Sequence, residues 1–273
     1  MQNVRFGFIG VGNMGGALAK AACRGAGGAE VLLAGRRPQK ARELAGRLGC
    51  AAADNAEVAG RAKYIFLGVK PQAMAGMLAG IAPVLASRAG QGGRFVLVSM
   101  AAGLTTARIA AMAGGDYPVL RIMPNTPVAV GAGMVFTARN PLVTDEEMQE
   151  FLQAMAPAGR FDPLDESLMD AGSAVAGCGP AFACLFLEAL ADGGVACGLP
   201  RAKAQEYAAQ MLLGTAALAL QTGQHPGVMK DAVCSPAGST IQGMQALEEG
   251  AVRGSVMRAV CAAWQKSRSL GDS

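Results

Sequence analysis

The stretch that most restricts the fold is GVGNMG, residues 10–15, which follows the apolar run VRFGFI and opens a segment with helical spacing. A G-x-G-x-x-G pattern between a strand and a helix is typical of dinucleotide-binding units. Gly10 permits the tight turn, Gly12 lets the backbone approach a pyrophosphate, and Gly15 allows the helix to pack closely on the strand. A tight turn without a ligand is the alternative for this pattern taken alone. In its context, the pattern predicts a dinucleotide site at a helix start, where unpaired N–H groups attract anions.

Strand and helix patterns alternate through the first half of the chain. Apolar runs recur at EVLLAG, KYIFLGVK, RFVLVSMAAG, PVLRIMPNTP and GMVFTA, and helices are expected between them at 38–48, 71–86 and 105–113. Regular alternation of this kind predicts a doubly wound parallel sheet. After these runs, Thr144 and Glu147 have the spacing of a capping box and are expected to open another helix.

The remainder of the chain has almost no strand signal beyond Phe161. Helices are expected at about 166–176, 180–197, 200–221, 238–249 and 252–268. They are rich in Ala, Gly, Leu and Met on more than one face, and a helix apolar around most of its circumference must be buried on most sides. We therefore predict a Rossmann-type α/β domain over 1–163, followed by an all-α dimerisation domain over 164–273 whose core is completed by a partner subunit.

Composition excludes several other classes. The 273 residues are 52% hydrophobic and 16% charged, which favours an oligomer, and the net charge of +4 forms no basic block for nucleic acid. The apolar run that begins at Tyr207 is shorter than the roughly 20 residues of a membrane span, and the N-terminus reads as a strand rather than a leader. Seven cysteines without a C-x-x-C pair, beside one histidine, support no disulfide framework and no metal site. These features are typical of a cytoplasmic protein with buried thiols.

The end of the second strand indicates which dinucleotide is bound. Glu30 has the sequence distance of a ribose-binding acid, but it precedes its strand, whereas Arg36 and Arg37 follow it. Two guanidinium groups favour a 2′-phosphate, hence NADP(H), with NAD(H) possible and a solvated arginine pair as the alternative. Lys70 and Asn125 follow two further strands, where X-Pro turns without a ligand are the alternative. The predicted coenzyme site comprises Gly10, Gly12, Asn13, Met14, Gly15, Arg36, Arg37, Asn55, Val69, Lys70, Pro71 and Asn125.

Several longer blocks carry a family resemblance. They are GVGNMGGAL, GVKPQ, RIMPNTPVAVGAGM, GCGPAF, ALADGGVACGLPR and HPGVMKDAVCSPAGSTIQGMQALE. Together and in this order the chain resembles pyrroline-5-carboxylate reductases. The resemblance implies reduction of Δ1-pyrroline-5-carboxylate to L-proline with NADPH or NADH, a Rossmann domain with a helical dimerisation domain, and a homodimer that can assemble into a decamer.

The resemblance also places a substrate loop at residues 235–240. It implies substrate contacts from Ser235, Gly238, Ser239 and Thr240, and Thr240 is the expected catalytic residue. Backbone N–H groups of residues 238–240 are expected to hold the substrate carboxylate, while the Thr240 hydroxyl meets the ring nitrogen. The family's usual S-P-G-G-T-T reads S-P-A-G-S-T here, and Ala237 would be costly if its φ were positive. A capped helix start without a ligand is the alternative for this stretch.

Four other interpretations of the sequence were weighed. His225 ahead of Pro226 indicates a turn residue more than a proton donor. Glu188 and Asp192 share a helix face and could bind magnesium, as in a ketol-acid reductoisomerase, although an exposed acidic face is the common explanation. Two-domain hydroxyacid dehydrogenases resemble one another in a Lys and an Asn on the first long helix after the domain boundary. Residues 171–190 contain neither, which disfavours that class of enzyme. The alternative that is not an enzyme is a noncatalytic NADP-binding sensor or scaffold.

Overall fold

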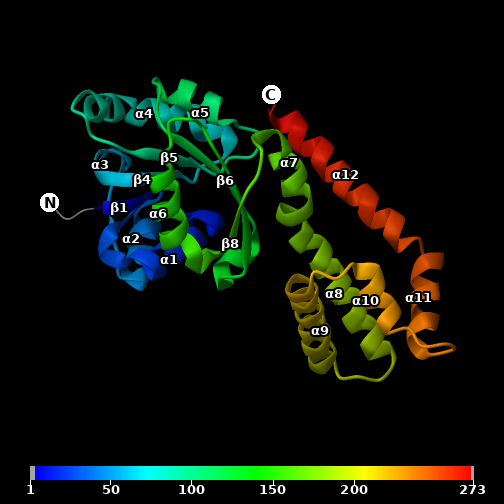
Figure 1. Ribbon diagram of the computed structural model, residues 1–273. Helices are drawn as coiled ribbons and strands as arrows, with labels where there is room; N and C mark the ends of the chain where they lie inside the picture. The colour runs from blue at the N-terminus through cyan, green and yellow to red at the C-terminus, as the bar shows by residue number, and fades with distance from the viewer. Residues whose placement is uncertain (1–3, 272–273) are drawn as a thin grey trace. The chain divides into compact units, whose positions relative to one another are not determined.

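The computed structural model describes residues 4–271, which form two compact units (Figure 1). The first unit runs to Gly177 and includes the end of the last helix from Trp264, and the second is Cys178–Ala263. The division therefore falls fourteen residues after the boundary expected at Pro163.

The first unit is built on an eight-stranded sheet with the order β3-β2-β1-β4-β5-β6-β7-β8. Strands β1 to β6 pair in parallel, β7 is antiparallel to β6, and β8 is parallel to β7. The chain reverses its direction of strand addition between β1 and β4, which is the point where doubly wound sheets bind ligands. The strands are β1 Val4–Ile9, β2 Val31–Ala34, β3 Ala51–Ala52, β4 Ala62–Leu67, β5 Val96–Ser99, β6 Val119–Pro124, β7 Gly133–Arg139 and β8 Gly159–Pro163.

Helices cover both faces of this sheet, as the alternation predicts (Figure 1). Phe6 and Phe8 of β1 pack in one core cluster with residues of α1, α2 and α6, whereas Ile9 packs in another with residues of α3, α4 and α5. Successive residues of a strand point to opposite faces, so β1 contributes to both cores. The helices are α1 Asn13–Ala26, α2 Pro38–Leu48, α3 Asn55–Arg61, α4 Pro71–Gly90, α5 Thr106–Ala113 and α6 Asp145–Met155. Short 3₁₀ turns lie at η1 Gly28–Glu30, η2 Thr126–Val130 and η3 Ala156–Ala158.

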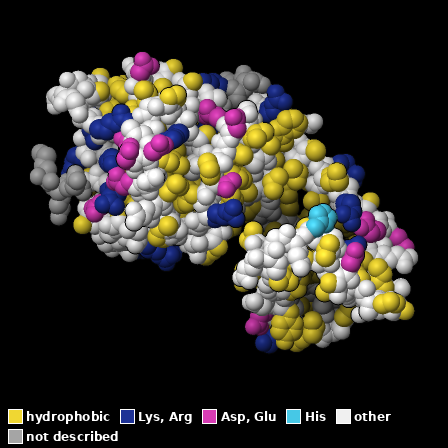
Figure 2. Space-filling view, in the orientation of Figure 1, with side chains coloured by type: hydrophobic (Ala, Val, Ile, Leu, Met, Phe, Trp, Pro, Cys, Tyr) yellow, Lys and Arg dark blue, Asp and Glu magenta, His cyan; other side chains and the backbone are white. Residues whose placement is uncertain are grey.

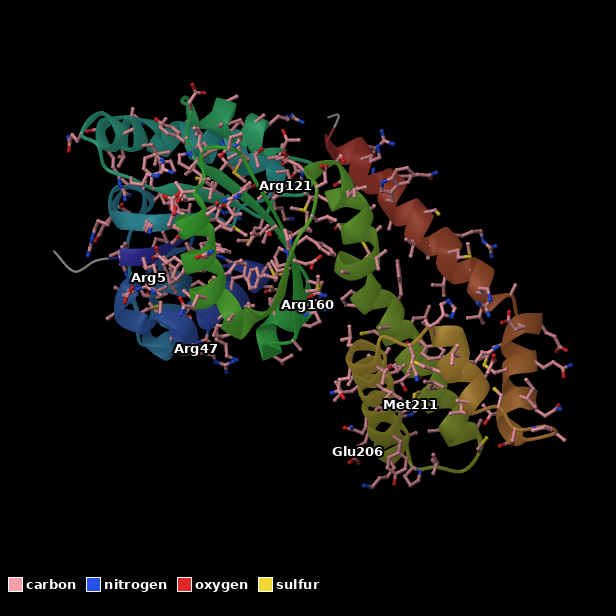
Figure 3. All side chains as sticks on the ribbon, viewed as in Figure 1. Arg5, Arg47, Arg121, Arg160, Glu206 and Met211 are labelled. Atoms are coloured by element: carbon pink, nitrogen blue, oxygen red, sulfur yellow. The ribbon has the colours of Figure 1, made fainter. Side chains whose placement is uncertain are left out.

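The segment after β8 packs on the sheet through a buried arginine. Arg121 of β6 is only 3% exposed, and its guanidinium lies 3.3 Å from Glu166 and 3.7 Å from Asp170 (Figure 3). Glu166 also accepts hydrogen bonds from the backbone and hydroxyl of Thr106. These contacts hold η4 Glu166–Leu168, α7 Met169–Gly172 and the π-helical turn η5 Ser173–Gly177 within the first unit.

The second unit is entirely helical among its described residues. It contains α8 Gly179–Ala196, α9 Arg201–Thr222, α10 Pro226–Ala232, α11 Ser239–Glu249 and most of α12 Val252–Gly271. Within this one chain, α8 and α9 bury only Ala191, Ala204 and Ala208. Leu185 and Leu213 are more than 60% exposed. Figure 2 shows hydrophobic side chains gathered on the visible face of these helices.

Two helical stretches are long and apolar enough to cross a membrane by length and composition alone, which the sequence did not lead us to expect. They are Pro71–Gly90 and Glu166–Ala196. The first is α4, whose residues Met74, Leu78, Ile81 and Leu85 are buried in the core of the first unit. Core helices of globular domains pass the same test.

Candidate active site

The glycine turn after β1 has the geometry that a close approach to a ligand requires. Gly10 has a φ of +105°, and a Cβ on it would lie 2.3 Å from the carbonyl oxygen of Gly68. A Cβ on Gly15 would lie 2.2 Å from the carbonyl oxygen of Gly10. At Gly12, by contrast, no described atom lies within 4 Å of the Cβ position. Gly10 and Gly15 therefore pack against neighbouring backbone, whereas the space beside Gly12 is open.

The start of α1 is free to bind an anion. Gly12 is its N-cap, and no side chain of the described residues caps this end. The first N–H groups of a helix have no intrahelical acceptor, so those of Asn13 and Met14 are available at this end. The Met14 side chain, in contrast, packs against the hydrophobic core.

A cleft of about 300 Å³ lies beside this turn at the carboxyl ends of β1, β2 and β4. Its lining includes the predicted residues Gly10, Gly12, Arg36, Arg37, Val69 and Lys70. It also includes Lys40, which sequence reasoning missed. Lys40 lies in the first turn of the helix that begins at Pro38, close after the two arginines, but the sequence does not show which side of that helix faces the cleft.

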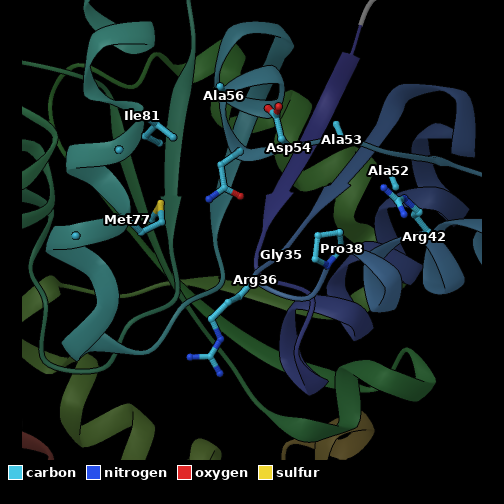
Figure 4. Close-up of a pocket in the computed structure, with 13 residues that line it drawn as sticks. Gly35, Arg36, Pro38, Arg42, Ala52, Ala53, Asp54, Ala56, Met77 and Ile81 are labelled. Carbon is cyan, nitrogen blue, oxygen red and sulfur yellow. The ribbon is translucent and has the colours of Figure 1, made fainter.

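A second hollow of about 750 Å³ shares Gly35 and Arg36 with that cleft. Asn55, predicted as a coenzyme contact, lines it at the start of α3. Figure 4 shows Met77 and Ile81 of α4 on one side and Pro38 and Arg42 of α2 on the other. The two hollows form a surface that runs from the glycine turn past Arg36.

The charged residues that line the cleft with Arg36 are all basic. Glu30 lies at the amino end of β2, where its carboxylate is 2.9 Å from the Arg5 guanidinium. Asp54 lies in the hollow, but its carboxylate caps α3 by accepting a hydrogen bond of 2.8 Å from the Glu57 N–H. The positive charges of Arg36 and Lys40 therefore face the cleft, and the acid at the expected sequence distance lies at the opposite edge.

Pro71 and Asn125 occupy different surroundings. Pro71 is the first residue of α4, directly after Lys70. Asn125 follows β6 and is 9% exposed, and its Oδ1 accepts from the Met134 N–H while its Nδ2 donates to the Ala176 carbonyl. The Asn125 amide thus ties β6 to β7 and to the π-helical turn, and its contact with a coenzyme stays a prediction.

The substrate loop of the second unit forms a tight turn. Residues Ser235 to Gly238 are closed by a hydrogen bond of 3.0 Å from the Gly238 N–H to the Ser235 carbonyl. Proline in the second place and a positive φ in the third are the pattern of a type II turn, and Ala237 has a φ of 58°. The suspected conformational cost at Ala237 is therefore present.

One detail of the predicted carboxylate site is wrong. The Gly238 N–H closes the turn, because the fourth residue of a β-turn donates to the first, so it is engaged within the loop. Helix α11 begins at Ser239 with Gly238 as its N-cap, and no described side chain caps it. The open donors are those of Ser239, Thr240 and Ile241, and Ile241 was missed.

The hydroxyl groups of this loop surround the helix start. A Cβ on Gly238 would lie 2.3 Å from Ser235 Oγ, so the serine hydroxyl sits directly over the glycine. Ser235, Ser239 and Thr240 are exposed in this chain. The loop therefore offers open N–H donors and small hydroxyl side chains at a helix N-terminus.

The other candidates have structural partners. His225 Nδ1 accepts a hydrogen bond of 3.1 Å from the Gly227 N–H and caps α10. Asp192 forms an ion pair with Arg201 instead of sharing a site with Glu188. Among residues 4–271, no group of three or more His, Cys, Asp or Glu side chains could hold a metal ion.

The sheet order and the open glycine turn define a dinucleotide-binding protein of the Rossmann class with an appended helical unit. Residues 5–103 match the family model described as NADP oxidoreductase, coenzyme F420-dependent, and residues 166–270 match the model for pyrroline-5-carboxylate reductase dimerisation. The chain is 38% identical to the pyrroline-5-carboxylate reductase of Escherichia coli, over 98% of this chain and 99% of that protein. It is 36% identical to the enzyme of Methanosarcina acetivorans, over 99% of both chains. The chain belongs to the pyrroline-5-carboxylate reductase family.

Solved structures agree with this assignment. The Plasmodium falciparum pyrroline carboxylate reductase, crystallised with NADP bound, superposes with a TM-score of 0.87 at 30% identity and covers 99% of both chains. The Streptococcus pyogenes enzyme has the same TM-score and identity, and 98% of this chain is covered. A ketol-acid reductoisomerase from an uncultured archaeon reaches 0.62 at 15% identity, which shows a shared fold alone.

Proposed function

We propose that this chain transfers a hydride from NADPH, or from NADH, to the C=N bond of Δ1-pyrroline-5-carboxylate and so makes L-proline. This reaction is the last step of proline biosynthesis. The observation that carries the proposal is the open start of α11, with its three hydroxyl side chains, in a chain that belongs to this family. A small anion fits this loop because backbone donors at a helix start stabilise a carboxylate without an arginine.

The coenzyme cleft supports the NADPH preference. The open N–H groups at the start of α1 hold the pyrophosphate, and Arg36, Arg37 and Lys40 hold the 2′-phosphate. The hollow beside Asn55 and Met77 accepts the adenosine. Lys70, Val69 and Pro71 follow β4 and border the coenzyme on the α4 side.

The chemistry needs little from side chains. Bound NADPH supplies the hydride, and the imine nitrogen is basic enough to gain its proton from water. The N–H groups of Ser239 and Thr240 hold the substrate carboxylate, and the Thr240 hydroxyl contacts the ring nitrogen. Catalysis is then mainly orientation of the reacting atoms, for which about 7 to 11 kcal/mol is available in well-ordered systems.

The assembly follows from the helical unit. We propose a homodimer through residues 166–270, the stretch that matches the dimerisation model, with further assembly into a decamer and a cytoplasmic location. Exposed leucines on α8 and α9 support the dimer, because apolar area of this kind is rarely left open to water. We propose no nucleic-acid partner and no membrane.

Thr240 gives the direct test. With purified protein, NADPH and the cyclic imine, Thr240→Ala is expected to lower kcat by roughly 100-fold, the order of magnitude of losing one hydrogen bond at a reacting centre. Thr240→Ser keeps the hydroxyl and should retain most of the activity. An unchanged kcat and KM in Thr240→Ala would remove Thr240 from the reaction.

The same assay separates the alternative functions. A sensor or scaffold would bind NADPH without consuming it in the presence of the imine. A ketol-acid reductoisomerase would consume it with a keto acid and magnesium, and would lose activity in EDTA. We expect turnover with the imine alone, undiminished by EDTA.

A further inference from the structure

The first turn of α10 depends on one residue for its hydrogen bonds. Pro226, the first residue of the helix, has no N–H group to donate. The N–H of Gly227 donates to Nδ1 of His225 at 3.1 Å. The N–H groups of Val228 and Met229 donate to the His225 carbonyl at 2.9 and 3.3 Å. His225 therefore accepts from every backbone N–H among the first four residues of α10.

The His225 imidazole lies directly over the backbone at this helix start. A Cβ on Gly227 would lie 3.0 Å from Nδ1 of the ring and 3.3 Å from its Cε1, so glycine leaves the room that the ring occupies. A ring nitrogen accepts a hydrogen bond only while it carries no proton, so Nε2 holds the proton in this arrangement. Among residues 4–271, the ring forms no other hydrogen bond and no ion pair. The ring acts in this chain as a helix cap.

Little else in this chain stabilises α10. The helix spans only seven residues and buries none of them. Short helices are marginal without packing or caps, because the first turn fixes several backbone angles for a single hydrogen bond. Loss of the His225 cap is therefore expected to loosen the whole of α10.

Helix α10 leads directly into the proposed substrate loop. The N–H of Cys234 donates to the Asp231 carbonyl at 3.0 Å, so the turn that ends the helix adjoins Ser235. Ser235 in turn begins the tight turn that the Gly238 N–H closes. No unbonded stretch of chain separates the helix from the loop, so a movement of α10 also moves the start of the loop.

We propose that His225 is a positioning residue for the substrate loop: its Nδ1 cap holds α10, and α10 holds the loop in the conformation that binds the imine. The inference rests on the proposed function of that loop. It differs from a proton-donor role, because the ring acts on the helix backbone and takes no part in the proton transfer. Without the cap, only a fraction of the molecules has the loop formed, and the apparent substrate affinity falls by that fraction. Saturating substrate restores the bound conformation, so KM rises while kcat is retained.

Two substitutions distinguish the cap from other roles of the ring. His225→Asn places a side-chain oxygen near the position of Nδ1 and is a favoured helix cap, whereas His225→Gln carries its amide one carbon farther out and is not. With NADPH and the cyclic imine, KM for the imine should rise by roughly 3- to 10-fold in His225→Gln and stay within about twofold in His225→Asn. Both variants should keep the kcat of the unmodified chain and its Kd for NADPH.

The matched control removes a cap in the first unit. Thr105 caps α5 by accepting a hydrogen bond of 3.2 Å from the Arg108 N–H. Thr105→Ala should lower the Tm and leave KM for the imine unchanged. Amide hydrogen exchange of the full chain adds a measurement that needs no substrate. The protection of residues 226–238 should fall in His225→Gln and be kept in His225→Asn.

Three results would overturn the proposal. An unchanged KM in His225→Gln would show that the cap does not act on substrate binding. A loss of kcat in His225→Asn would indicate proton transfer through the ring. Faster exchange in α10 without faster exchange in residues 235–238 would separate the helix from the loop. If the unmodified chain does not reduce the imine, the proposed function fails, and the exchange measurement still decides whether the cap holds the loop.

Discussion

At the scale of single residues, Ala237 illustrates how one backbone angle shapes the substrate loop. Its φ of 58° lies in the left-handed region, which side chains with a Cβ adopt only at a cost. The turn keeps this angle because Pro236 fixes the second position and the Gly238 N–H closes the hydrogen bond to Ser235. The turn therefore holds the loop in one conformation and lowers the folding stability of the chain.

Replacing Ala237 by glycine should raise the free energy of unfolding by about 0.5 to 1 kcal/mol, because glycine adopts this φ without strain. The control is Ala246→Gly, an exposed position inside α11, where the same change should lower it by about 1 kcal/mol. Urea unfolding measures both. Equal losses in the two variants would contradict strain at Ala237.

Arg36 is the residue on which coenzyme choice should depend. Loss of a charge-assisted hydrogen bond to the 2′-phosphate removes about 1.5 to 3 kcal/mol, so Arg36→Ala should weaken NADPH binding by roughly 10- to 100-fold and NADH binding little. Arg47→Ala, at the other end of α2 (Figure 3), is the control and should change neither affinity. Fluorescence titration with both coenzymes measures this, and equal weakening of the two would exclude a 2′-phosphate contact.

At the scale of elements, α6 depends on a carboxylate that serves two purposes. Glu147 completes the capping box with Thr144, and its carboxylate also receives two hydrogen bonds from Arg94, of 2.7 and 2.8 Å. Burial alone would raise the pKa of Glu147, but the hydrogen bonds from Arg94 and Thr144 outweigh it and lower the pKa. The ionised form therefore contributes to stability.

Glu147→Gln should lower the free energy of unfolding at neutral pH by about 1 to 3 kcal/mol. Because the pKa of Glu147 is lower in the folded state, its contribution is complete above the unfolded value of about 4.3 and is lost as the pH falls through the folded value. The difference from the unmodified protein should therefore shrink in acid.

The control for this position is Glu146→Gln on the exposed side of the same helix. It should change stability by less than about 0.5 kcal/mol. Unfolding curves at several pH values test both variants, and a Glu147→Gln effect that does not vary with pH would contradict the role of the ion pair.

Elements with strong local signals were predicted well, and short ones were not. Helix α2 was expected at 38–48 and is observed as Pro38–Leu48, because proline and regular apolar spacing mark it. Strand β3 consists only of Ala51–Ala52. It is a strand because it pairs with β2, so its local sequence does not predict it. Helices α3 and α10 span seven residues each, too few for a periodic pattern to show.

At the scale of the whole molecule, the helical unit lacks a core of its own in one chain. Leu213 and Leu220 are 64% and 76% exposed, and they lie seven residues apart on α9, hence on one side of it. Area of this kind is expected to be covered by a second copy of the same unit.

Leu213→Glu combined with Leu220→Glu should dissociate the dimer, because two carboxylates per chain would be buried without partners. Light scattering coupled to size exclusion should then give the mass of one chain, 27.6 kDa. The control Gln39→Glu with Gln91→Glu adds the same charge to the first unit and should leave the assembly intact. A dimer that survives the leucine changes would place the interface elsewhere.

The parts of the candidate site that lie within one contiguous motif could be proposed from the sequence. The glycine turn, Arg36 with Arg37, and the loop before α11 are each contiguous in sequence. Lys40, Ile241 and the closed hydrogen bond of Gly238 were missed, because the first depends on which side of α2 faces the cleft and the others on where the turn ends and the helix begins.

By itself, the sequence determined the alternation of strands and helices, the anion-binding turn and the family, because periodicity, glycine positions and long motifs are local properties. Only the tertiary structure decided that Arg121 anchors the segment after β8 and that Asn125 bonds to main-chain groups. These facts depend on which distant segments pack together, and packing is set by the burial of the whole core rather than by any local pattern.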